Sequence, residues 1–304
     1  MFFAISTFLK VNLNQTLYLK KDFFLNEGVK LHLSAADRDF WDQASLKRVK
    51  PLTQIRYSTA IAHRIAARSG QPATTIASQL KELILQQLVD LDPEYNGNPW
   101  QLIAETVTVE VLASGLLLFQ IEPVGLATWL DYLLESLGPD SSILATTRFS
   151  PDPGWVSRVA GPLFTLQHSH ARCGSILRLS HRQRSDYFNA LDQSPQPWQW
   201  LSSPPMAWLP LLEEAPIARQ WVSHLCTLLD ALAEPTQALT RDSLLTLGLS
   251  LSQGFDGCYR AFPLGSIAPH PEKLQAFLGL TLITQRLLAL LLEQGLGCPA
   301  PDQL

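Results

Sequence analysis

The chain changes its hydrophobic periodicity near its middle, and this change limits the folds that it can adopt. Before about residue 150, apolar and polar residues alternate in short segments, which indicates half-buried strands. Such segments occur at 11–19, 29–33 and 107–111, and a turn at Ser114-Gly115 leads into the apolar run 116–121. Beyond Trp155, the apolar residues follow helical spacing, and proline-rich loops interrupt them. The sequence therefore predicts an α+β N-terminal domain with a small antiparallel sheet and helices, followed by an all-α bundle.

Helical segments and breaks set the expected domain boundaries. Leu126, Leu130, Leu133 and Leu137 form a stripe in a helix that follows Pro123 and ends before Gly138. Ser, Pro and Gly are common just after it, as in a linker. The last helix, about 271–295, is almost wholly apolar on one side. We expect a first domain at 1–138, a linker at 139–154 and a helical bundle at 155–304.

Composition bears on the class of partner. Hydrophobic residues make up 46% of the chain and charged residues only 16%, so we expect apolar surface patches that favour a protein partner. The net charge is −4, and residues 155–304 carry 10 Lys and Arg against 11 Asp and Glu. Nucleic-acid surfaces are usually basic, and the totals do not indicate one, although a local patch remains possible.

Cysteine spacing and hydropathy exclude several other classes. The four cysteines form no CxxC pair, and His168 and His170 are two apart, which on a helix points them to different faces. We therefore expect no metal and no cofactor. The apolar start lacks a basic region and a cleavage signal, and no apolar run reaches the length of a membrane span. A cytoplasmic protein without a membrane segment is expected.

Three blocks in the second half resemble the DALR anticodon-binding domain of arginyl-tRNA synthetases. They are the helix Pro162–Arg178 with its Gln-His-Ser-His-Ala-Arg core, the segment Ser252–Arg260, and the ending Leu296–Leu304. Their order and spacing are similar to those of the family over residues 155–304. In the first half, Arg56–Ala62, followed by Pro72 and Ile76-Ala77, is similar to the additional domain of the same enzymes.

The nucleotide-binding part of that family has no counterpart here. Only about 30 residues separate Pro123 from Trp155, whereas a doubly wound domain needs on the order of 100. No HxGH motif, no KMSKS-like lysine loop and no GxxxxGK loop is present to hold ATP phosphates. We therefore expect a non-catalytic protein with no catalytic residues.

The resemblance implies a tRNA-binding face on the helix that contains Pro162–Arg178. Thr165, His168 and Arg172, at i, i+3 and i+7, share one face and correspond to two Tyr and an Arg that meet the anticodon loop in the family. His and Arg can stack on bases, but Thr cannot. The terminal Leu304 replaces a Met that also approaches the anticodon. Leu116 and Leu118 replace the aromatic and amide groups of the D-loop contact, which weakens that expectation.

Basic residues provide candidate phosphate contacts in two places. Arg178, Arg182 and Arg184 follow Arg172 along the same helix and its exit, and Lys47, Arg48 and Lys50 precede Pro51. A solvated surface explains each group equally well.

Two functions from different classes follow. The first is an adaptor that presents or retains an arginine-type tRNA without charging it. The second is a protein-interaction or assembly factor that reuses the fold without RNA; Leu116, Leu118, Thr165 and the acidic balance favour it. Half of a split synthetase that works with a separate catalytic chain is the least favoured alternative.

Overall fold

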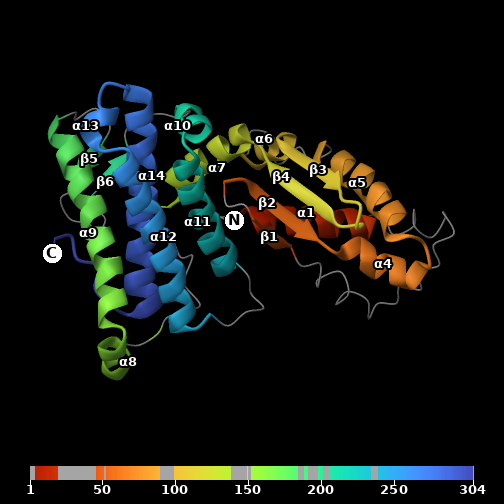
Figure 1. Cartoon of the computed structure of the whole chain (residues 1–304), viewed down its shortest axis with the longest axis horizontal. Helices are drawn as coiled ribbons and strands as arrows, with labels where there is room; N and C mark the ends of the chain where they lie inside the picture. The colour runs from red at the N-terminus through yellow and green to blue at the C-terminus, as the bar shows by residue number, and fades with distance from the viewer. Residues whose placement is uncertain are drawn as a thin grey trace. The chain divides into compact units, whose positions relative to one another are not determined.

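The structure is a computed structural model that describes residues 4–19, 46–50, 53–89, 99–137, 149, 152–183, 188–190, 198–200, 206–233 and 239–303. The chain divides into two compact units, Met1–Leu126 and Ala127–Leu304. The first unit contains an antiparallel sheet with helices, and the second is mainly helical (Figure 1). The predicted fold class, α+β followed by a helical bundle, is confirmed.

A four-stranded antiparallel sheet forms the centre of the first unit. The strands are arranged in the order β1 (Lys47–Val49), β2 (Ile55–Thr59), β4 (Leu117–Ile121) and β3 (Val107–Val111). Strands β3 and β4 form a hairpin that pairs Val109 with Phe119. Gly115 turns the chain between them with φ of 85°, a conformation that favours glycine. The alternating segment 107–111 and most of the apolar run 116–121 are therefore strands, as predicted.

The helices of the first unit bury the apolar residues that the sequence places three or four apart. They are α1 (Ile5–Leu19), α4 (Ile61–Ser69), α5 (Ala73–Val89) and α6 (Pro99–Glu105). Helix α4 ends at Gly70, whose φ of 73° is the left-handed conformation of a C-terminal cap. Helix α5 packs against α1, α4, α6 and β3.

The strand predicted at 11–19 is wrong, because this segment belongs to helix α1. Leu9, Leu13 and Leu17 are all buried and lie four residues apart, on one face of the helix. A spacing of four fits both a period of 2 and a period of 3.6, so the alternation did not distinguish the two. Residues 29–33 lie outside the described residues.

Helix α7 (Pro123–Ser136) spans the boundary between the two units. The expected domain end at residue 138 lies after this helix, whereas the compact units divide within it. Most of the expected linker at 139–154 falls outside the described residues. Its end is structured, because Asp152 caps helix α8 (Pro153–Arg158) by accepting hydrogen bonds from the backbone N–H groups of Gly154 and Trp155.

Long helices form the second unit. They are α9 (Ala160–Gln183), α11 (Pro216–Ala233), α12 (Arg241–Ala261) and α14 (Pro271–Leu290), with the short helices α10 (Leu209–Glu214) and α13 (Leu264–Ile267). Helix α9 packs against both α12 and α14, and α11 packs against α12 (Figure 1). A two-stranded ladder, β5 (Phe188–Ala190) with β6 (Trp198–Trp200), is an addition to the predicted all-helical bundle.

Helix α14 and the π-helical turn η3 (Leu291–Leu296) that continues it form the core of this unit. The combined segment Pro271–Leu296 is long and apolar enough to cross a membrane by length and composition, but its apolar stretch is 94% buried inside the protein. A helix that is apolar on all sides is typical of the centre of a large bundle. Its burial explains this apolar character without a membrane.

Two glycines of α12 give a test of how closely α11 and α12 approach. A Cβ at Gly254 would lie 3.2 Å from Cα of Trp221 and 2.9 Å from the ring of His224, whereas at Gly257 it would meet only the flexible end of Ile217. Alanine gains about 1 kcal/mol of helix propensity at either position, but overpacking costs about 1–3 kcal/mol. We expect Gly254→Ala to destabilise the protein by about 1 kcal/mol and Gly257→Ala to stabilise it slightly. Urea unfolding measures both; equal effects would contradict the close helix crossing.

Candidate nucleic-acid interface

Helix α9 leaves one side exposed to solvent while its other side packs in the bundle. The buried positions, such as Leu163, Leu166, His170 and Leu177, repeat every three or four residues. The opposite side, which we call the outer face of α9, consists of Phe164, Thr165, His168, Arg172, Ser175, Leu179 and Arg182. The structure thus places Thr165, His168 and Arg172 together, as their spacing predicts.

Two aromatic rings lie on this face near its N-terminal end. The side chain of Phe164 is 56% exposed, and its ring stacks on that of exposed His168 with centroids 6.1 Å apart and planes at 29°. No role for Phe164 was predicted from the sequence. Its position four residues before His168 was the available signal, because residues at i and i+4 are neighbours on a helix.

Arg172 is held by two residues of α12. Its guanidinium Nη1 lies 3.4 Å from a carboxylate oxygen of Asp256, and its Cζ lies 4.3 Å from the centroid of the Tyr259 ring. The side chain remains 33% exposed. Asp256 and Tyr259 belong to the second block of the resemblance, but neither was predicted from the sequence to take part in the site.

The C-terminal segment, residues 297–303, lies along one edge of α9. Gln167 donates a hydrogen bond to the carbonyl of Pro299 at 3.0 Å, and Arg178 donates one to the carbonyl of Asp302 at 2.9 Å. His170 Nδ1 lies 2.9 Å from the carbonyl oxygen of Pro301. Since a carbonyl only accepts, Nδ1 carries the proton. Burial lowers the pKa of His170, so the imidazole is neutral at pH 7.

These contacts explain part of the Gln-His-Ser-His-Ala-Arg block by structure alone. Gln167 and His170 bind the C-terminal segment, and Ser169 is fully buried. His168 and Arg172 are the members of the block that face outward. The candidate interface therefore rests on these two residues and on Phe164.

The predicted phosphate contacts on α9 are separated by the structure. Arg182 is exposed on the outer face, whereas Arg178 is turned to the C-terminal segment and also donates a hydrogen bond to Ser175. Arg184 and Leu304 lie outside the described residues.

The predicted residues of the first unit lie in its sheet or next to a strand of it. Lys47 and Lys50 are exposed, and Arg48 lies over the Tyr57 ring at 5.0 Å. Leu118 on β4 is only 7% exposed, and Leu116 precedes the same strand and is half-buried. Buried leucine at position 118 offers neither a hydrogen bond nor an exposed surface to RNA.

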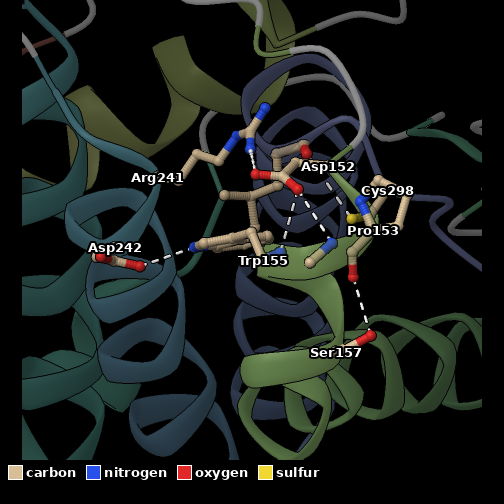
Figure 2. Close-up of polar contacts among 9 residues, drawn as sticks. Asp152, Pro153, Trp155, Ser157, Arg241, Asp242 and Cys298 are labelled. Carbon is tan, nitrogen blue, oxygen red and sulfur yellow. Dashed lines mark hydrogen bonds and ion pairs between the residues drawn. The ribbon is translucent and has the colours of Figure 1, made fainter.

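A second polar cluster near the start of α8 joins three parts of the bundle (Figure 2). Arg241 at the start of α12 pairs with Asp152 at 3.2 Å, and the indole N–H of Trp155 donates a hydrogen bond to Asp242 at 2.8 Å. Cys298, from the C-terminal segment, lies beside them in Figure 2. The hydrogen bonds from backbone N–H groups are the main cause that lowers the pKa of Asp152, and Arg241 lowers it further. Asp152 pairs with Arg241, and Trp155 binds Asp242, so the polar groups are used within the protein and the cluster has a structural role.

Within the described part of the chain, no group of three or more His, Cys, Asp or Glu side chains is placed to hold a metal ion. Comparison of the whole chain with protein-family models, curated proteins and solved structures gives no match. The resemblance to arginyl-tRNA synthetases that the residue blocks suggest therefore stays a prediction.

Proposed function

We propose that this chain is a non-catalytic RNA-binding module that holds an arginine-type tRNA by its anticodon loop and acts as an adaptor. The observation that carries the proposal is the exposed, stacked Phe164–His168 pair with half-exposed Arg172 beside it. Unpaired bases stack on aromatic rings and on guanidinium planes, and each such stack contributes about 1–3 kcal/mol. The residue blocks of the bundle supply the arginine-type expectation.

The geometry supports a short loop as the ligand. Phe164 and Arg172 are eight residues apart, which is about 12 Å along a helix. The bases of an RNA duplex are stacked on each other and are not free to stack on side chains, whereas loop bases can turn outward. A surface of this length and chemistry suits unpaired nucleotides.

Binding of labelled arginine tRNA to the purified full chain tests the proposal. We expect the double variant Phe164→Ala/His168→Ala to weaken binding by about 30-fold or more, because two stacks of about 1–3 kcal/mol each are lost. Leu102→Ala is the matched control, since Leu102 is 54% exposed but lies on α6 in the other unit. Absence of RNA binding, or equal weakening by Leu102→Ala, would refute the proposal.

A protein-interaction or assembly factor is the second candidate. The pairing of Arg172 with Asp256 favours it, because it neutralises the charge that RNA would meet, and Phe164 and Leu179 are exposed apolar side chains on the same face. Isolating the protein from its own cells and identifying bound RNA and protein together separates the two candidates. A stoichiometric protein partner without an enriched tRNA would support this one.

A further inference from the structure

The guanidinium of Arg172 is fixed in orientation by α12. Asp256 and Tyr259 are three residues apart and so share one side of that helix. Asp256 contacts the guanidinium at 3.4 Å, and the Tyr259 ring lies beneath it at 4.3 Å. Behind Tyr259 is Phe255, which is fully buried, with ring centroids 6.3 Å apart. The ring that supports Arg172 is therefore itself supported by the core.

This arrangement changes what Arg172 can bind. A guanidinium bound to a carboxylate has lost most of its net attraction for a phosphate group, because the two charges cancel at short range. Its planar face still stacks, since stacking does not require the edge that the carboxylate occupies. One face of Arg172 lies on Tyr259, and the side chain remains 33% exposed to solvent.

The neighbouring groups on the outer face have the same character. Phe164 and His168 form the other flat surface, and Thr165 between them is uncharged. Arg178 is turned toward Asp302. Arg182 lies ten residues beyond Arg172, about 15 Å along the helix. The part of the outer face between Phe164 and Arg172 therefore offers flat aromatic and guanidinium surfaces to a ligand rather than net positive charge.

We propose that Asp256 and Tyr259 are positioning residues that hold Arg172 as a flat stacking surface, so that this face binds unpaired bases and not phosphate groups. The inference rests on the proposed function and defines which part of the RNA is recognised. It predicts that affinity depends only weakly on salt concentration, since few counterions are released when no phosphate is neutralised.

Two labelled RNA hairpins test this inference. One carries the anticodon arm of an arginine tRNA, and the other has the same stem and the same number of loop phosphates but no bases in the loop. We expect the full chain to bind the hairpin without loop bases at least 10-fold more weakly. Equal binding of the two hairpins would overturn the inference and the base stacking that it assumes, but would leave binding of an arginine-type tRNA standing, whereas absence of binding to the intact hairpin would refute both.

Asp256→Asn tests the positioning role. Removing the carboxylate frees the charge of Arg172 for a phosphate, so the magnitude of the salt slope of log K should rise by about 0.7, the value for one contact to single-stranded RNA. The variant should bind the hairpin without loop bases more tightly than the parent chain does. Its preference for the intact hairpin over the hairpin without loop bases should therefore be smaller. The matched control is Glu272→Gln, which removes one negative charge at an exposed position of α14. An unchanged salt slope in Asp256→Asn, or the same change in the control, would overturn the inference.

Tyr259→Leu separates positioning from a general loss of structure. Leucine keeps an apolar contact with the core but gives no flat ring beneath Arg172. We expect weaker binding of the intact hairpin, an unchanged affinity for the hairpin without loop bases, and unfolding close to that of the parent chain. Equal weakening for both hairpins would contradict the role of Tyr259.

Discussion

Replacing Trp221 with alanine is expected to lower the free energy of unfolding by about 3–5 kcal/mol, the range for a large buried aromatic residue. Trp221 on α11 is fully buried, and its ring lies 5.7 Å, between centroids, from both Phe255 and Phe277. Its indole N–H donates a hydrogen bond at 3.0 Å to the hydroxyl of Thr284, which is also fully buried. The variant would lose packing with α12 and α14 and leave that hydroxyl without this partner.

Urea unfolding followed by far-ultraviolet circular dichroism measures the effect. The free energy of unfolding of Trp221→Phe should lie between those of the parent chain and Trp221→Ala. This variant retains a ring but loses the hydrogen bond, which contributes about 1 kcal/mol. Phe164→Ala serves as the control, since Phe164 is 56% exposed and such substitutions usually stay within about 0.5 kcal/mol. A loss for Trp221→Ala as small as that of Phe164→Ala would contradict the packing described for the three helices. The control also shows that the RNA-binding variant remains folded.

Raising the pH above 9 is expected to destabilise the protein through its buried thiols. All four cysteines are buried, and burial raises the pKa of Cys258 to about 12 and that of Cys173 well above its ordinary value. Between pH 9 and 12, the thiol of Cys258 ionises in the unfolded chain but stays protonated in the folded one. The unfolded state then binds fewer protons, so stability falls as pH rises.

The size of this effect follows from the pKa difference. Each pH unit above 9 removes about 1.4 kcal/mol through Cys258, up to about 4 kcal/mol at pH 12. Unfolding free energies of the parent chain and of Cys258→Ala, measured from pH 8 to pH 10.5, should give a shallower decline for the variant. An equal decline of the unfolding free energy with pH in the parent chain and in Cys258→Ala would refute the raised pKa of Cys258. As an independent check, a thiol reagent at pH 8 should react slowly with the folded protein and rapidly with all four cysteines in urea.

Some parts of the candidate site were predictable from spacing within one helix. Thr165, His168 and Arg172 share a face of α9 because the i, i+3, i+7 relation follows from 3.6 residues per turn. Phe164 could have been added by the same rule. Asp256 could not be paired with Arg172 in this way, since 84 residues separate them and only the packing of α9 on α12 brings them to 3.4 Å. The attachment of Arg178 to the Asp302 carbonyl, 124 residues away, is of the same kind.

The amino-acid sequence by itself determined the local elements: the β3–β4 hairpin from its alternating valines, the turn at Gly115, the helix stripes and the mostly apolar α14. These follow from steric and hydrophobic rules that act over a few residues. Where two periods fit the same residues, as at Leu9, Leu13 and Leu17, only the burial of α1, which packs against α5, decided for a helix. Tertiary structure alone decided that Arg172 is neutralised by Asp256 while Phe164 stays exposed, because charge pairing and exposure depend on which distant surfaces meet.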